Sequence, residues 1–216
     1  MAFPVSPRTQ AVDGLKLLVV GEVNVGKSAM CKRYTERVWI GTTRTTSGLD
    51  CSLRVTEING RQVSLALWDI AGLERSLNMT RAYYQNAHGA IIVFDKSSAP
   101  TWEKVQLWLK DIREKVFHPD GKPLPVVLMA HKCDLPGSQM PEDSVIQEFI
   151  TADGSITGCH DTSAVTGEGI DAAIQELVLR IWEIQSTAVA PTSAPAGPRV
   201  VLSSSHSQPR TSGCAC

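Results

Sequence analysis

The chain has 216 residues, a hydrophobic fraction of 43% and a formal net charge of −1 at pH 7. This length suits one domain, and the apolar fraction is sufficient for a globular core. Nucleic acid is excluded as the main partner, because binding to phosphates requires clustered lysines and arginines. The longest apolar runs are too short to cross a bilayer, and residues 1–13 lack the apolar segment of a secretory signal, so we expect synthesis in the cytosol.

The first elements predicted along the chain are a buried strand, a helix and a hairpin. Residues 15–20 form a short apolar run, which is typical of a buried strand, and residues 27–37 follow as a helix. Residues 50–57 and 62–68 alternate between apolar and polar side chains and are joined by Ile-Asn-Gly-Arg. Because Asn-Gly favours tight hairpin turns, these two strands are expected to be antiparallel neighbours.

Strands and helices then alternate to the end of the domain. The predicted strands are residues 89–94, 124–130 and 155–160, and the predicted helices are residues 78–86, 101–116, 141–150 and 169–185. One helix has apolar residues at helical spacing that are expected in the core: Trp102, Val105, Leu109, Ile112 and Val116. The alternation predicts a three-layer α/β fold with a mainly parallel six-stranded sheet and one antiparallel edge strand.

The composition changes from about residue 186 to serine, proline, alanine and glycine. This segment has no acidic residue and only Arg199 and Arg210 as full positive charges. It buries too little apolar surface to offset its conformational entropy. We therefore predict a folded domain over residues 14–185, between a flexible N-terminus and a disordered tail over residues 186–216.

Cysteines occur at positions 31, 51, 133, 159, 214 and 216, without a Cys-x-x-Cys pair or a histidine at metal-ligand spacing. The first four are expected to be reduced thiols of a cytosolic domain.

A phosphate-binding motif follows the first strand. Residues 21–28, Gly-Glu-Val-Asn-Val-Gly-Lys-Ser, match G-x-x-x-x-G-K-[ST] between a predicted strand and helix. Backbone N–H groups of such a loop surround phosphate oxygens, while Lys27 neutralises them and Ser28 is expected to bind Mg²⁺. Further nucleotide contacts are predicted at Val23, Asn24, Val25, Gly26 and Ala29.

Asp69 stands at the end of the second hairpin strand, followed by Ala71 and Gly72. Its carboxylate is expected to hold Mg²⁺ through water, and the Gly72 N–H to reach a γ-phosphate. Alone, Trp-Asp-Ile-Ala-Gly fits any strand end. Downstream of a phosphate loop it predicts the second half of one site.

These motifs resemble those of the Rab family of Ras-superfamily GTPases, from Leu15 to about Ile184. Residues 68–72, 78–84 and 119–128 are similar to the Rab branch that serves lysosome-related organelles. The resemblance implies a P-loop NTPase (Ras-like) fold and a switch that binds GTP or GDP with Mg²⁺ and recruits effectors in vesicle traffic. It further implies the cytoplasmic face of intracellular membranes, endolysosomal or lysosome-related, with a cytosolic pool.

The resemblance also assigns roles that the chemistry alone leaves open. Thr46 matches the first-switch threonine that contacts Mg²⁺ and the γ-phosphate. Trp39 matches the aromatic residue that covers the guanine edge, with a packing role as the alternative. Trp68 and Tyr83 match two members of an aromatic triad that links the switches, whereas Cys51 replaces the usual phenylalanine, which implies altered effector choice.

The guanine site resembles the family pattern Asn-Lys-x-Asp with one change at its first position. Asp134 can accept hydrogen bonds from the guanine N1–H and exocyclic amine, a pattern that adenine lacks. Lys132 can lay its aliphatic stem along the base. His131 stands where asparagine is usual.

The last base loop matches at Ser163 and Ala164, where the Ala164 N–H is expected to meet the guanine carbonyl. Val165 replaces the usual lysine. Together with the histidine, it predicts weaker guanine affinity with specificity retained.

Leu73 occupies the position where the family carries the glutamine that orients the attacking water, so no catalytic residue is intact there. Leucine cannot hydrogen-bond water, which predicts impaired intrinsic GTP hydrolysis. Rab-activating proteins can supply a glutamine and an arginine, so assisted hydrolysis stays open. The alternatives are a constitutively GTP-bound recruitment module and a nucleotide-weak pseudo-GTPase scaffold.

The chain ends in Cys214-Ala215-Cys216, which resembles the double prenylation signal of Rab proteins. Two lipid chains give stable membrane anchoring, whereas one gives reversible binding. The implied partners are Rab effectors, a guanine-nucleotide exchange factor, a GTPase-activating protein, a prenylation escort and a GDP-dissociation inhibitor.

Overall fold

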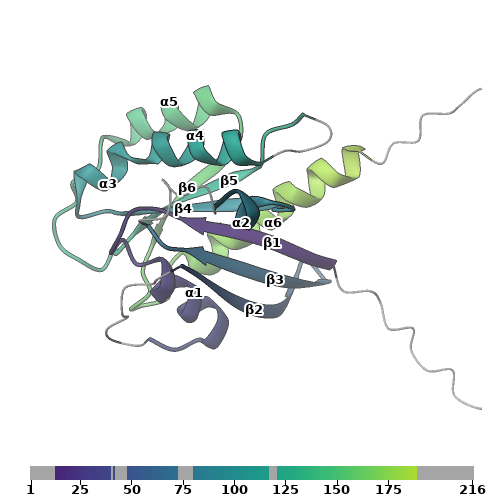
Figure 1. The fold of residues 1–216 in the computed structure, drawn as a ribbon. Helices are drawn as coiled ribbons and strands as arrows, with labels where there is room; N and C mark the ends of the chain where they lie inside the picture. Colours follow the sequence, from purple (N-terminus) through teal and green to yellow (C-terminus); the bar gives the residue numbers. More distant parts are fainter. Residues whose placement is uncertain (1–12, 40, 42–47, 73–79, 117–120, 189–216) are drawn as a thin grey trace, which may run out of the picture.

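The computed structural model describes residues 13–39, 41, 48–72, 80–116 and 121–188, which form a central sheet flanked by helices (Figure 1). The elements in chain order are β1 (Asp13–Val20), α1 (Lys27–Glu36), β2 (Leu49–Ile58), β3 (Arg61–Ile70), α2 (Thr80–Tyr84), β4 (Gly89–Asp95), α3 (Ala99–Glu103), α4 (Val105–Lys115), β5 (Val126–His131), α5 (Asp143–Asp153), β6 (Ile156–Thr162) and α6 (Ile170–Ala188).

The sheet has six strands in the order β2-β3-β1-β4-β5-β6, and only the β2–β3 pair is antiparallel. This confirms the predicted fold class and its antiparallel edge strand. The hairpin turns at Asn59 and Gly60, whose φ angles of 49° and 77° are both positive. Asparagine and glycine tolerate this conformation best, so the turn sets Ile58 opposite Arg61 and thereby the register of the pair.

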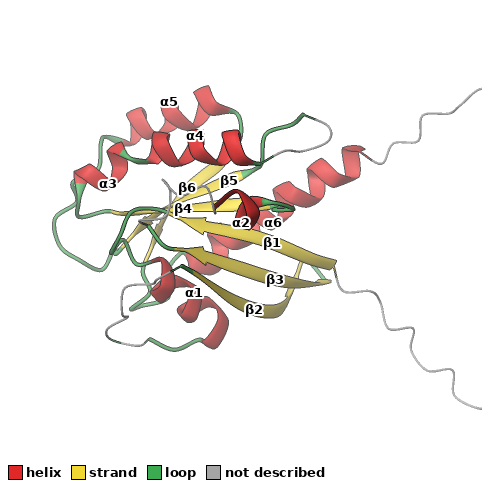
Figure 2. Cartoon of the chain, viewed as in Figure 1, coloured by secondary structure: helices red, strands yellow, loops and turns green. Residues whose placement is uncertain are grey.

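Two hydrophobic clusters lie on opposite faces of the sheet, and β1 contributes to both because its side chains alternate. Leu17 and Val19 pack with α1 and α6, whereas Leu18 and Val20 pack with α2 and α4. Figure 2 shows these helical layers on either side of the strands. Each fully buried leucine or valine contributes roughly 1.5–3 kcal/mol, so the alternation fixes the strand between the layers.

The helix predicted over residues 101–116 is interrupted in the structure. α3 ends at Glu103, and the backbone N–H of Lys104 donates to the Trp102 carbonyl instead of continuing the α-helical pattern. The predicted core residues nevertheless pack together. Val105, Leu109 and Ile112 are buried, while Trp102 and Val116 pack at the margin of the cluster.

Other boundaries differ by a few residues. β5 begins at Val126 rather than at residue 124, because prolines at 123 and 125 have no N–H for a sheet ladder. α6 continues to Ala188, past the predicted domain end at 185. Among the described residues, the helices are all too short or too polar to span a bilayer.

Candidate nucleotide-binding site

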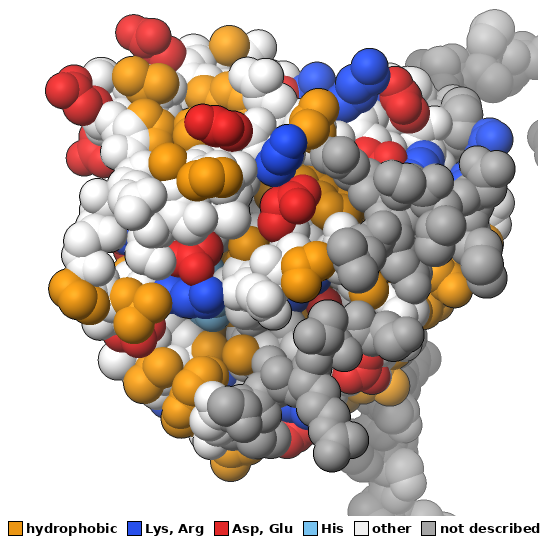
Figure 3. All heavy atoms as spheres, turned by 60° about the vertical axis from the view of Figure 1, so that its left-hand side comes forward, with side chains coloured by type: hydrophobic (Ala, Val, Ile, Leu, Met, Phe, Trp, Pro, Cys, Tyr) orange, Lys and Arg blue, Asp and Glu red, His pale blue; other side chains and the backbone are white. Residues whose placement is uncertain are grey.

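The predicted site residues gather where the parallel strands end. β1 and β3 point toward the left in Figure 1, and ligands of open α/β sheets bind at the carboxyl ends of the strands. Figure 3 turns this side forward and shows acidic, basic and hydrophobic side chains interspersed, without one dominant charge. A ligand bound on this side would therefore be held by particular side chains and backbone groups rather than by an overall surface charge.

The loop between β1 and α1 positions the amine of Lys27. Lys27 is only 6% exposed, and its Nζ donates to the carbonyl oxygens of Gly21 and Glu22, each at 2.9 Å. Burial lowers the pKa of this amine, while the Asp69 carboxylate acts in the opposite direction. The loop thus presents a preplaced cation beside the N-terminus of α1, where an anion is favoured.

Gly72 brings the end of β3 against this loop. A Cβ atom on Gly72 would lie 2.6 Å from the backbone nitrogen of Val23 and 2.9 Å from the carbonyl oxygen of Gly21. Real Cβ atoms do not approach backbone so closely, so glycine is required. The contact joins the two predicted halves of the site.

Ser28 and Asp69 meet at this junction. The Ser28 hydroxyl donates a short hydrogen bond to Oδ2 of Asp69, a carboxylate that is 2% exposed. Hydroxyl and carboxylate oxygens are the ligands that Mg²⁺ prefers, and Mg²⁺ commonly keeps waters and substrate phosphates as its other ligands. The donor set therefore fits the metal that the sequence predicts.

Lys132 is held by a carboxylate at the end of β4. Nζ of Lys132 donates to Oδ2 of Asp95 at 2.6 Å, at the end of β4. Burial acts to raise the pKa of Asp95, but the hydrogen bonds from Lys132 and Ser97 outweigh it, so the net pKa is lowered. The Asp95 carboxylate is thus held ionised and anchors Lys132.

Ser163 connects the two base motifs. Its buried hydroxyl donates to Oδ1 of Asp134 at 2.6 Å and accepts the backbone N–H groups of Val165 and Thr166 at 3.1 and 3.2 Å. The carboxylate of Asp134 is exposed and available to a base. The backbone around Ala164 is consequently held beside it.

His131, the last residue of β5, lies between Thr162 and the phosphate loop. The ring is 1% exposed, and its Nδ1 lies 2.9 Å from the Thr162 hydroxyl oxygen. Burial, followed by the nearby Lys132 charge, lowers the pKa of His131 to about 4. A Cβ atom on Gly26 would lie 2.5 Å from the ring carbon Cδ2, so the neutral imidazole packs directly against the phosphate loop.

Two predicted residues have largely exposed side chains, although the Val165 backbone belongs to the base loop. Trp39 and Val165 are described but are 42% and 43% exposed. Thr46, Leu73, Cys214 and Cys216 lie outside the described residues. The four internal cysteines 31, 51, 133 and 159 are free thiols, as predicted.

Asp95 and Thr162 are site residues that the sequence reasoning missed. Asp95 carries the signal that identified Asp69, a carboxylate directly after a buried strand, and could have been found by it. Thr162 gives no such signal, because its importance depends on the register of β6 with β5.

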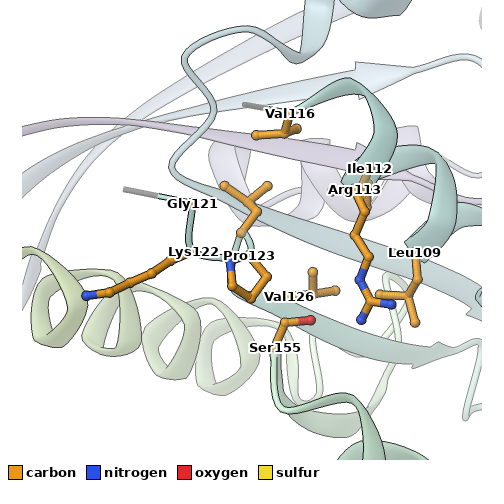
Figure 4. A pocket seen from close by; sticks show the side chains of 10 residues that line it. Leu109, Ile112, Arg113, Val116, Gly121, Lys122, Pro123, Val126 and Ser155 are labelled. Carbon is orange, nitrogen blue, oxygen red and sulfur yellow. The ribbon is translucent and has the colours of Figure 1, made fainter. Parts of the chain in front are cut away.

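A hollow of about 300 Å³ lies elsewhere, between α4 and the start of β5 (Figure 4). None of the residues predicted for nucleotide binding lines it. Its lining is mostly apolar: Leu109, Ile112, Arg113, Val116, Gly121, Lys122, Pro123, Leu124, Val126 and Ser155.

Comparison with known proteins agrees with this geometry. Residues 16–183 match the Ras family. The chain is 43% identical over 164 residues to Ras-related protein Rab-32 of Mus musculus, covering 76% of this chain and 73% of the relative. It is 35% identical over 164 residues to Ras-related protein Rab-7L1 of Homo sapiens, covering 76% and 80%. It is 41% identical over 175 residues to Ras-related protein Rab-32C of Dictyostelium discoideum, covering 80% and 75%.

Proposed function

This chain belongs to the Rab proteins of the Ras family, and we propose that it is a membrane-anchored GTP/GDP switch whose intrinsic GTP hydrolysis is impaired. Rab proteins bind GTP and GDP with Mg²⁺ and serve vesicle transport. The observation that carries the assignment is the meeting of Lys27, Ser28 and Asp69 with the Asp134–Ser163 pair at one end of the sheet.

The phosphate side acts through charge and preplacement. We assign Lys27 to the β- and γ-phosphate oxygens. To bind them, its amine would give up its hydrogen bonds to the carbonyl oxygens of Gly21 and Glu22. Ser28 and Asp69, with Thr46 from the first switch, would hold Mg²⁺, which neutralises phosphate charge when bound. The backbone of residues 23–29 and the Gly72 N–H complete the phosphate contacts.

The base side selects guanine through hydrogen-bond direction. The Asp134 carboxylate only accepts hydrogen bonds, which suits the N1–H and the amine of guanine. Lys132 would cover one side of the ring, and the Ala164 N–H would meet the guanine carbonyl. Trp39, which the structure leaves exposed, would have to move to cover the open edge of the base. His131 is neutral and larger than asparagine, so we expect guanine affinity below that of relatives with Asn-Lys-x-Asp.

An exchange of donors and acceptors tests the base assignment. Asp134→Asn places an amide where the carboxylate was, so binding of GDP should fall sharply while binding of xanthosine diphosphate should rise, because xanthine carries a carbonyl in place of the amine. Titration with ribose-labelled fluorescent nucleotides measures both. Asp134→Ala is the control that should lose both ligands. Unchanged selectivity in Asp134→Asn would show that this carboxylate does not read the base.

Impaired hydrolysis rests on Leu73, whose side chain cannot orient a water molecule. We expect the purified protein to carry mostly GTP when it is prepared without added nucleotide. Chromatography of the released nucleotide measures this. Mostly GDP would mean that turnover proceeds despite Leu73.

The same measurement decides a second candidate, a pseudo-GTPase scaffold. His131 and Val165 favour it, because both depart from the base-site pattern. The buried Lys27 amine and the Ser28–Asp69 pair argue against it, because they keep the phosphate side intact. Purified protein with no nucleotide at all would establish the scaffold instead.

Membrane anchoring is proposed for Cys214 and Cys216. Residues 189–216 follow α6, and a fully extended chain of this length spans roughly 90 Å. Such a length would let lipid-modified cysteines reach a bilayer while the domain stays away from it. A prenylation escort would deliver the chain to prenyl transfer, and a GDP-dissociation inhibitor would maintain the cytosolic pool. Cys214→Ser with Cys216→Ser should move the protein from endolysosomal or lysosome-related membranes to the cytosol in fractionation. Persistence on membranes would contradict the assignment.

A further inference from the structure

Arg33 lies in the last turn of α1 and bridges two segments far apart in the sequence. Its Nη2 donates to the carbonyl oxygen of Thr166 at 2.9 Å, and its Nη1 donates to the carbonyl oxygen of Arg37 at 3.3 Å. The guanidinium also lies flush against Gly167, where a Cβ atom would be 2.9 Å from Nη2. One planar group therefore contacts both the end of α1 and the base loop.

The base loop is otherwise stabilised mainly by its own hydrogen bonds. The N–H groups of Val165 and Thr166 donate to Ser163 Oγ, and the N–H of Gly167 donates to the Ser163 carbonyl at 2.9 Å. These bonds shape the loop but do not fix its distance from α1. The bond from Arg33 to Thr166 does so from outside the loop.

Apolar packing between the loop and α1 involves Ile170, which follows the loop and shares a buried cluster with Cys31 and Tyr34 of α1. A cleft of about 290 Å³ opens beside the bridge, lined by Arg33, Tyr34, Arg37, Thr166, Gly167, Ile170 and Asp171. The far end of the bridge is itself anchored, because the Arg37 guanidinium donates to both carboxylate oxygens of Asp171 at 2.5 and 3.0 Å. Hydrogen bonds of charged groups therefore add to this packing in setting the position of the loop against α1.

The same helix begins at the phosphate site. Arg33 follows Lys27 by six residues, about 9 Å along the helix axis. A rigid helix thus connects the group that holds phosphates to the group that holds the base loop. Such an arrangement fixes the separation between the phosphate and guanine subsites.

We propose that Arg33 is a positioning residue for guanine recognition, which holds the Thr166 carbonyl so that the Ala164 N–H is placed against the guanine carbonyl oxygen. This role rests on the proposed nucleotide-binding function. It makes Arg33 act on one atom of the base, O6, rather than on the nucleotide as a whole.

Three diphosphates that differ at single base atoms test this role. GDP carries both O6 and the exocyclic amine, inosine diphosphate keeps O6 but lacks the amine, and 6-thioguanosine diphosphate keeps the amine but replaces O6 by a weak acceptor. Release of each, labelled on the ribose, is followed by fluorescence after addition of excess GDP. Arg33→Gln is compared with the unchanged protein, and Lys32→Gln removes the neighbouring charge on α1 as a matched control.

Arg33→Gln should accelerate release of GDP and of inosine diphosphate by the same factor, about fivefold to tenfold for the loss of the charge-assisted hydrogen bond to the Thr166 carbonyl. Release of 6-thioguanosine diphosphate should change much less. Arg33→Lys, which keeps one donor for the Thr166 carbonyl, should give an intermediate factor, and it carries the same comparison if Arg33→Gln does not fold. Lys32→Gln should leave all three rates unchanged.

Equal acceleration for all three nucleotides would overturn the proposal, because a general loosening of the fold would not distinguish O6. Absence of any acceleration would overturn it as well. Failure of the unchanged protein to bind any of the three would instead disprove the nucleotide-binding function, and the role of Arg33 with it.

Discussion

Replacement of His131 by asparagine should remove a pH dependence of folding stability. Burial keeps the His131 ring neutral, with a pKa of about 4, whereas the unfolded chain binds this proton with a pKa near 6.5. Between these values the unfolded state carries more protons than the folded state. The stability that comes from the neutral His131 ring is therefore complete above pH 6.5 and is lost as the pH falls toward 4.

The magnitude follows from the displacement of the pKa. A shift of this size corresponds to about 3 kcal/mol in full, of which about 2 kcal/mol is lost between pH 7.5 and pH 5. The free energy of unfolding of the unchanged protein should thus decrease by about 2 kcal/mol more than that of His131→Asn over this interval. All other titrating groups are common to both proteins, so the difference isolates the histidine.

Urea unfolding followed by tryptophan fluorescence, at fixed GDP and Mg²⁺ concentrations, measures these free energies at the two pH values. The substitution also changes packing against Gly26 and the contact with Thr162, but these effects are present at both pH values and cancel in the comparison. Equal decreases in the two proteins would show that the ring accepts its proton without cost in the folded state. The reasoning from burial would then be wrong.

Four further outcomes can be measured on the same protein. Lys27→Met should weaken GDP binding by at least about a hundredfold in calorimetric titration, because a buried cation beside the phosphates is lost; retained affinity would remove Lys27 from the site. Gly72→Ala should lower stability by about 2 kcal/mol or more, as read from the thermal midpoint, whereas Gly14→Ala, where a Cβ atom meets open space, should not. Leu73→Gln should raise single-turnover GTP hydrolysis by about tenfold if the glutamine orients water, and an unchanged rate would place the defect elsewhere. His131→Asn should lower the Kd for GDP at pH 7.5, and an unchanged Kd would show that the ring already does what an amide would do.

The sheet could be predicted from the sequence wherever local signals agreed with the final packing. The Asn59-Gly60 turn identified the hairpin, since asparagine and glycine tolerate the positive φ angles that the turn requires, and the structure added the register of the pair. The break at Lys104 could not be predicted, because apolar residues continue at helical spacing on both sides of it. Only the hydrogen bond from the Lys104 N–H to the Trp102 carbonyl shows that α3 ends at Glu103.

The site divides in the same way. Lys27 and Ser28 were identified by a motif whose residues are adjacent, and the structure joins Ser28 to Asp69 as the strand order requires. Arg33 carried no signal, because the carbonyl that it contacts is 133 positions away in the sequence. The contact of the His131 ring with Gly26 also depends on tertiary structure, because the fold brings the end of β5 against the phosphate loop.

The position of β1 between β3 and β4 affects how the domain can fold during synthesis. β1 is synthesised first, yet it pairs on one side with β3 and on the other with β4, so the phosphate loop leaves the ribosome long before its supporting strands exist. Asp69, His131 and Ser163 are then synthesised in turn, and α6, which packs against β1, is the last of the described elements. A nascent chain halted before β6 would contain the complete phosphate motif without the base loop. Nucleotide that contacts both subsites could therefore stabilise only a chain in which the base loop has been synthesised.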